Sequence, residues 1–149
     1  MTKIIVLTDL HIVPKGGSII GLDPYTRLQK GITHINQHHP DTDCVVITGD
    51  LTHKGDIASY LRLKELLQPL SCPYHLLIGN HDQRENFIQV FPEQSIDDNG
   101  FIQSKIVTAQ GHLLLLDTLY APPYEFPKSS SGFLCEKRLA WLKIQLDQA

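Results

Sequence analysis

The sequence predicts an α/β fold whose sheet is mostly parallel. Short apolar runs rich in β-branched residues alternate with segments whose apolar residues recur at helical spacing. Strand, helix, strand, helix, strand is the order that gives a parallel sheet with crossover helices. The chain has 149 residues, of which 42% are hydrophobic and 19% are charged. That size and balance indicate one globular domain covering residues 1–149.

Three strands are expected where apolar runs are bounded by Asp, Gly, Asn or Pro. They are Lys3 to Thr8, Cys44 to Thr48 and Tyr74 to Ile78. Consecutive residues of a strand point to opposite faces of the sheet. Because consecutive residues of these runs are apolar, we expect both faces of the sheet to be buried.

Helices are expected after Asp23 and after Asp56, since an aspartate side chain can cap a helix start. The apolar residues that recur at helical spacing are Tyr25, Leu28, Ile32 and Ile35 in the first helix, and Ile57, Tyr60, Leu61, Leu67 and Leu70 in the second. A short helix is expected from Asp82 to Phe91.

The last part of the chain predicts an antiparallel hairpin and a final helix. Gly100 to Ala109 and His112 to Asp117 form the hairpin strands, joined by a turn at Gln110-Gly111. Leu139, Leu142 and Leu146 give the final helix one apolar face.

Composition excludes several kinds of protein. The net charge of -3 and the lack of a Lys/Arg cluster argue against binding to a nucleic-acid polymer. The first apolar run is too short for a signal peptide, and no stretch approaches a membrane span, so a cytoplasmic location is expected. Cys44, Cys72 and Cys135 are interpreted as free buried thiols.

Polar residues follow each predicted strand. The three segments are Thr8-Asp9-Leu10-His11, Thr48-Gly49-Asp50-Leu51-Thr52-His53 and Ile78-Gly79-Asn80-His81-Asp82. Because the carboxyl ends of parallel strands meet at one edge of the sheet, we expect these side chains to lie together there.

Carboxylate, amide and imidazole ligands without thiolate suit divalent Fe, Mn, Co or Zn. Asp9 and His11 flank one residue, so an extended segment would point both side chains the same way. Asp50 comes from a neighbouring strand and could bridge two ions. Gly49 and Gly79 are expected to let the backbone turn sharply.

Taken in order, Asp-x-His, Gly-Asp-Leu-Thr-His and Gly-Asn-His-Asp resemble the calcineurin-like metallophosphoesterase superfamily. The details are similar to its small bacterial branch of cyclic-nucleotide and glycerophosphodiester phosphodiesterases. The likeness extends to Gly21-Leu22-Asp23, to Lys54-Gly55-Asp56 and to Trp141-Leu142, and so covers nearly the whole chain. It implies the amino-terminal half of a four-layer αββα sandwich.

The resemblance also implies a mechanism, in which a metal-bound hydroxide at a binuclear centre hydrolyses a small phosphodiester. Asp9 and His11 would bind one of two divalent transition-metal ions, Asp50 would bridge them, and Asn80 would bind the second. His81 would lie near the phosphate and Asp82 would orient it. The position of His53 stays undecided: it could support the ligands from behind, lie at the rim of the site or face solvent.

One departure from the family pattern is large. The family completes both metal shells with later histidines, whereas here only His112 follows His81, and it lies in the predicted hairpin turn. The resemblance therefore implies an amino-terminal part only, whose partner is a complementary carboxyl-terminal chain or a second copy. The alternative is a truncated, non-catalytic metal- or phosphate-binding domain. Half a sandwich is expected to expose apolar surface.

Other candidates are weaker. Tyr25, Arg27 and Arg84 are near enough in sequence to contact substrate, but they fit surface helix positions better. Phe126, Pro127 and Phe133 belong to a long loop that could form a rim over the site. The helical histidines fit a solvated face, and His75 fits a strand or core position. A plain nucleotide-binding module is disfavoured because no Gly-x-Gly-x-x-Gly follows the first strand.

Overall fold

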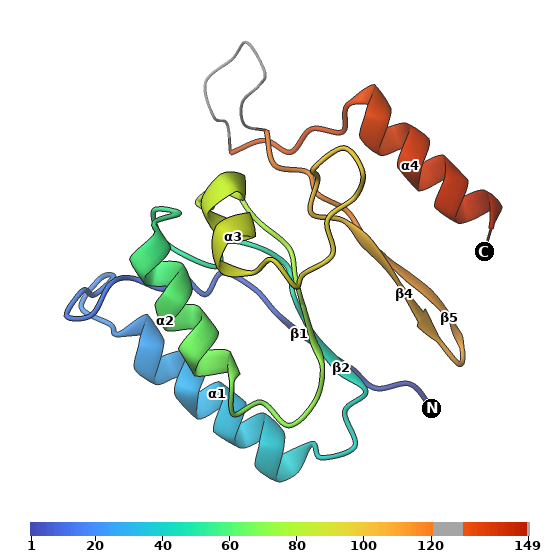
Figure 1. Cartoon of the computed structure of the whole chain (residues 1–149). Coiled ribbons are helices and arrows are strands. Elements are labelled where there is room, and N and C mark those ends of the chain that lie inside the picture. The colour runs from blue at the N-terminus through green and yellow to red at the C-terminus, as the bar shows by residue number, and fades with distance from the viewer. Residues whose placement is uncertain (121–129, 149) are drawn as a thin grey trace.

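The computed structural model describes residues 1–120 and 130–148 and confirms the α/β class (Figure 1). Strands and helices follow in the order β1 (Ile4–Leu7), α1 (Pro24–His38), β2 (Cys44–Ile47), α2 (Ile57–Leu67), β3 (Tyr74–Leu76), α3 (Arg84–Val90), β4 (Ser104–Thr108), β5 (Gly111–Leu115) and α4 (Glu136–Asp147).

The parallel sheet has the order β1-β2-β3, and β2 is its central strand. Val46 of β2 pairs with Val6 of β1 and with His75 of β3. All four residues of β2 are buried, as an uninterrupted apolar run predicts. Each strand is one or two residues shorter than predicted; β1 and β2 lose polar end residues, whereas β3 ends before the apolar Leu77 and Ile78.

Helices α1 and α2 cover one face of this sheet, where Val45 and Ile47 join the main core. Both begin at the predicted aspartates. The Asp23 carboxylate accepts hydrogen bonds from the backbone nitrogens of Tyr25 and Thr26 at the start of α1. Asp56 accepts one from the nitrogen of Ser59 at the start of α2. These caps satisfy backbone donors that the first helical turn leaves free, which fixes where each helix begins.

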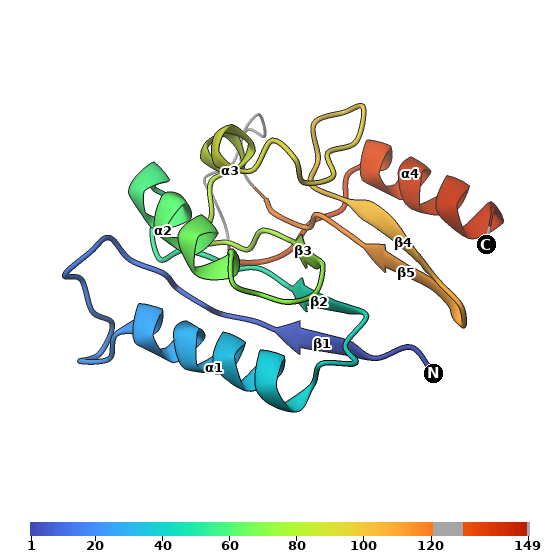
Figure 2. The ribbon, with the colours of Figure 1, turned by 60° about the horizontal axis from the view of Figure 1, so that its bottom comes forward.

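The hairpin β4–β5 packs on the other face of the sheet. Leu115 forms a second small core with Cys44 and Val46 of β2. Figure 2 shows the resulting order of layers, with α1 and α2, the parallel sheet, the hairpin and then α4. The hairpin is confirmed, but its turn lies one residue earlier than predicted, at Ala109-Gln110, because Thr108 pairs with Gly111.

Several large apolar side chains of the described residues are exposed, as predicted for an incompletely covered sandwich. Val6 of β1 is 60% exposed on the side of the sheet that the hairpin faces, and Val107 of β4 is 68% exposed. Leu139 and Leu146 of α4 are also exposed. Among the helices that the structure describes, none combines the length and the apolar character needed to span a membrane.

Candidate metal centre

Three loops meet at the carboxyl edge of the parallel sheet. Beyond β1 and β2 the backbone pairing continues, since His11 N donates to the carbonyl of Asp50 at 2.8 Å. Ile12 and Thr52 then form an isolated parallel bridge. The loops after the first two strands are therefore held side by side, as if the strands continued through the site.

The backbone at three predicted ligands is left-handed. Asp9 has φ 55°, His11 has φ 47° and Asp50 has φ 47°, and among the described non-glycine residues only Ile20 also has a positive φ. Such a conformation costs on the order of 1–3 kcal/mol per residue and clusters at functional sites. The prediction that an extended segment aims Asp9 and His11 is thus wrong, because left-handed turns set their direction.

These turns bring the side chains of Asp9, His11 and Asp50 together, and we call the three residues the carboxylate group. His11 Nε2 lies 3.8 Å from Asp9 Oδ1 and 3.7 Å from Asp50 Oδ2. The Asp9 side chain is 62% exposed, whereas those of His11 and Asp50 are 24% and 15% exposed. The group therefore has one side open to solvent and one side fixed in the protein.

The loop after β3 approaches the Asp50 loop closely. A Cβ added to Gly79 would lie 2.5 Å from the backbone nitrogen of Asp50. His81 N donates to Asp50 Oδ1 at 2.9 Å. Asn80, between Gly79 and His81 in the sequence, is half-buried. Gly49 has φ 118°, as a sharp turn requires. Gly79 has no positive φ, so close approach rather than a turn explains its lack of a side chain.

A second cluster shares His11. One nitrogen each of His11, His53 and His81 lies within 4.8 Å of the others, and we call these residues the histidine group. The His53 and His81 rings stack with centroids 5.2 Å apart. His81 Nδ1 lies 2.8 Å from the carbonyl oxygen of His53, which orients the His81 ring. Burial, followed by the neighbouring His81 and His11, lowers the pKa of His53.

Asp82 lies beneath the loops and is buried. Its carboxylate accepts hydrogen bonds from the backbone nitrogens of Leu51, Thr52 and Gly79 at 2.9, 3.0 and 2.9 Å, and from the hydroxyls of Thr52 and Tyr60. Burial raises the pKa of Asp82, while these hydrogen bonds act in the opposite direction. Asp82 thus joins the second and third loops. The contact that orients the His81 ring comes from the His53 carbonyl, not from the predicted carboxylate.

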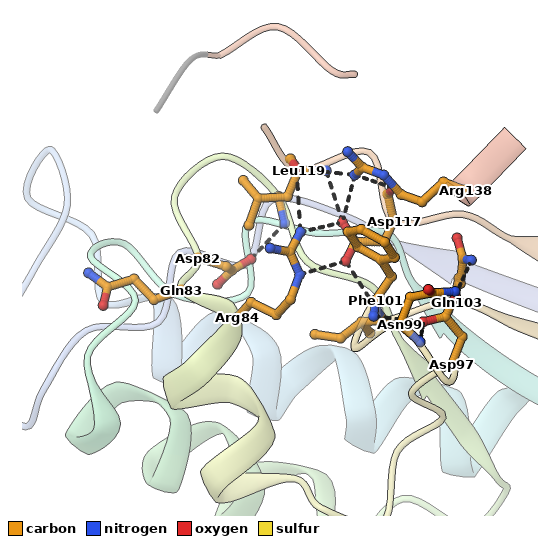
Figure 3. A network of polar contacts seen from close by, with 12 residues as sticks. Asp82, Gln83, Arg84, Asp97, Asn99, Phe101, Gln103, Asp117, Leu119 and Arg138 are labelled. Carbon is orange, nitrogen blue, oxygen red and sulfur yellow. Dashed lines mark hydrogen bonds and ion pairs between the residues drawn. The ribbon is translucent and has the colours of Figure 1, made fainter. Parts of the chain in front are cut away.

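Sequence reasoning missed a buried charge network next to these loops (Figure 3). Arg84, at the start of α3, donates two hydrogen bonds of 2.9 and 3.0 Å to the fully buried carboxylate of Asp117. Arg138 of α4 donates to the Asp117 carbonyl at 2.7 Å. The surface position predicted for Arg84 is therefore wrong. Asp117 follows an apolar strand, as Asp9 and Asp50 do, and that signal could have drawn attention to it.

A pocket of about 390 Å³ opens beside the carboxylate group. Arg27 lines it together with Asp9, His11 and the apolar side chains of Ile19 and Leu22. Arg27 therefore lies in a pocket next to the carboxylate group, as a residue that contacts substrate would.

Of the other predicted rim and helix residues, Tyr25 lies under the guanidinium of Arg62. Phe133 lines a different cavity, beside Arg84 and Phe101. Phe126 and Pro127 fall outside the part of the chain that the structure describes.

Comparison with known proteins gives a consistent result. The family model described as calcineurin-like phosphoesterase matches residues 2–144. A probable cyclic nucleotide phosphodiesterase of Rhodopseudomonas palustris is 44% identical over 99% of the chain and 52% of its own length. A probable glycerophosphodiester phosphodiesterase of Arcobacter nitrofigilis is 31% identical over 97% of the chain and 52% of its length. A 3',5'-cyclic adenosine monophosphate phosphodiesterase of Pseudomonas aeruginosa is 26% identical over 96% and 49%. The chain spans about half the length of the curated relatives it matches.

Proposed function

Because the chain belongs to the calcineurin-like phosphoesterase family, we propose that it hydrolyses small phosphodiesters with two divalent transition-metal ions at the carboxyl edge of its sheet. The observation that carries this proposal is the geometry of the carboxylate group. Its three residues have left-handed backbones, and one ligand atom of each lies within 4.8 Å of the others. The names of the relatives support cyclic nucleotides and glycerophosphodiesters as substrate classes.

The donor set fits divalent Fe, Mn, Co or Zn. Asp9 and His11 would hold one ion, Asp50 would bridge, and Asn80 would hold the second. Carboxylate oxygens and an imidazole nitrogen converge without thiolate, on a face partly open to solvent. His11 Nδ1 is also buried and has no hydrogen-bond partner among the described residues. The orientation of the His11 ring therefore depends on the contacts of its other nitrogen, Nε2, with Asp9 and Asp50.

Two ions held by these residues would supply Lewis acidity, lowering the pKa of a water molecule and offsetting negative charge on the phosphoryl oxygens. His81 and Asp82 position the other groups of the site. His81 N holds the Asp50 carboxylate, and His81 Nδ1 is held by the His53 carbonyl. With Nδ1 held by this carbonyl, Nε2 is the ring nitrogen of His81 that is left for a phosphoryl oxygen. Asp82 keeps the second and third loops in register and acts as a positioning residue.

The pocket beside the carboxylate group is suited to the organic part of a diester. Its lining combines apolar side chains with Arg27 and also includes Asp9 and His11 of the carboxylate group. A phosphate held at the carboxylate group would place one ester substituent there. This arrangement supports a small diester rather than a polymer as substrate.

A second candidate function is a metal- or phosphate-binding domain without catalysis, or one half of an enzyme made of two chains. The observation that favours it is the ligand count, since the carboxylate group offers three ligand residues among the described residues, few for two ions. It predicts metal uptake without hydrolysis by the chain alone.

The test uses the chain loaded with Mn²⁺ or Co²⁺ and the substrate bis(p-nitrophenyl) phosphate. Asp50→Asn tolerates a left-handed backbone and is expected to slow hydrolysis by about 100-fold or more, since it removes charge stabilisation worth several kcal/mol. Asp98→Asn, in an exposed loop, is the matched control. An unchanged rate in Asp50→Asn refutes the proposal, and metal uptake by calorimetry without turnover supports the second candidate.

A further inference from the structure

We propose that the histidine group, His11, His53 and His81, is a second cation site that takes Zn²⁺. It overlaps the carboxylate group because both use His11. His53 is the residue that sets this site apart, since the family pattern assigns it no ligand role. The inference rests on the proposed metal role of His11 but not on hydrolysis.

The first support is the spacing of the three rings. Their centroids lie 5.5 Å apart for His11 and His53, 4.6 Å for His11 and His81, and 5.2 Å for His53 and His81. Zinc binds imidazole nitrogens at about 2.0–2.1 Å in tetrahedral geometry, which places ligand nitrogens about 3.3 Å apart. Nitrogens now within 4.8 Å reach that spacing by small side-chain rotations.

The second support is the hydrogen bonding of the rings. A carbonyl oxygen can only accept, so the His53 carbonyl fixes the proton of His81 on Nδ1 and leaves the lone pair on Nε2. Metal-binding histidines are oriented in this way, by a carbonyl or carboxylate on the other nitrogen. His53 Nδ1 is buried and has no hydrogen-bond partner among the described residues, and coordination to a cation would use its lone pair instead.

The backbone also holds His53 in place. His53 N donates to the carbonyl of Ile12 at 3.0 Å, which continues the pairing of the first two loops. His53 therefore stands on the same frame as His11, and each of the two is one residue from the Ile12–Thr52 bridge. A ligand on such a frame loses little conformational freedom when a cation binds.

The two donor sets differ in the ion that they prefer. Three imidazoles without a carboxylate suit Zn²⁺, whereas two carboxylates with one imidazole suit Mn²⁺ better. Since one His11 ring serves one group at a time, Zn²⁺ in the histidine group removes His11 from Asp9 and Asp50. It also removes His81 from the phosphate. The two sites are thus alternative states of one set of loops.

The test measures Zn²⁺ and Mn²⁺ affinity of the chain by competition with a chelator. All proteins carry His34→Gln, because the His34 and His38 rings lie 4.5 Å apart on α1 and could bind Zn²⁺ themselves. His53→Gln is expected to weaken Zn²⁺ binding by about tenfold or more and to leave Mn²⁺ binding within about twofold. Asp9→Asn is expected to weaken mainly Mn²⁺ binding. His112→Gln, on the exposed hairpin, is the matched control and should change neither.

X-ray absorption of the Zn²⁺-loaded chain gives an independent count of imidazole ligands. Three are expected, falling to two in His53→Gln. Unchanged Zn²⁺ affinity in His53→Gln, or a single imidazole on zinc, overturns the proposal. Retained Mn²⁺ binding shows that the variant is folded. Neither measurement reads hydrolysis, so a chain that is inactive when loaded with Mn²⁺ but binds zinc through three imidazoles refutes the proposed function alone.

Discussion

Replacing Asp82 with asparagine tests whether one buried carboxylate holds the loops of the candidate site together. The carboxylate accepts hydrogen bonds from three backbone N–H groups, of Leu51, Thr52 and Gly79, and from the hydroxyls of Thr52 and Tyr60. An asparagine side chain has the same shape but only one acceptor oxygen. The substitution therefore changes the hydrogen bonds without opening a cavity.

The cost follows from the better of the two amide orientations. With its oxygen towards Leu51 and Gly79, the amide keeps both backbone donors, and its NH₂ group donates to the hydroxyl oxygens of Thr52 and Tyr60. The N–H of Thr52 is then left buried without an acceptor, which costs about 1–3 kcal/mol. The two retained backbone bonds lose the benefit of a charged acceptor, at about 1 kcal/mol each. We expect a total loss of about 3–5 kcal/mol, a large part of the typical stability of a domain.

Urea unfolding followed by far-ultraviolet circular dichroism measures this loss by linear extrapolation. Asp98→Asn makes the same chemical change in an exposed loop and is expected to stay within about 0.5 kcal/mol of the parent. A loss below about 1 kcal/mol in Asp82→Asn would show that the loops do not depend on these hydrogen bonds.

Gly79→Ala is expected to cost about 1–3 kcal/mol and to weaken Mn²⁺ binding, because its Cβ would lie 2.5 Å from the backbone nitrogen of Asp50. Gly31→Ala, inside α1 with nothing within 4 Å of the new Cβ, should instead stabilise the chain by about 0.5–1 kcal/mol; thermal unfolding that ranks the two variants in the opposite order contradicts this account. Arg84→Met is expected to cost about 3–5 kcal/mol in urea unfolding, since it removes two hydrogen bonds from the fully buried carboxylate of Asp117, and a loss under about 1 kcal/mol would contradict that role.

The fold was largely predictable because its signals are local. The central strand reads as a continuous apolar run, and Asp23 and Asp56 cap α1 and α2 as the sequence predicts. The shared edge of parallel strands then brings together residues that are 41 positions apart in sequence, such as Asp9 and Asp50. Their metal-binding roles stay predictions.

What the sequence did not predict depends on contacts made across the fold. Arg84 sits in a helical pattern that is typical of a solvated face, but its partner Asp117 lies 33 residues away on the end of a hairpin strand. The left-handed turns at Asp9 and His11 have no pattern of their own, because backbone pairing with the neighbouring loop imposes them. The His53 carbonyl that orients His81 is likewise a main-chain group, which residue identity does not indicate.

Because the backbone of Asp9, His11 and Asp50 is left-handed, keeping these side chains lowers the stability of the fold. At such a position glycine removes the clash of a Cβ with its own backbone, so it relieves strain of about 1 kcal/mol while it deletes a ligand. Asp9, with its largely exposed side chain, gives up the fewest packing contacts in that exchange. Selection of variants for thermal resistance alone is therefore expected to discard these side chains, so their retention under such selection would indicate a separate requirement for the site.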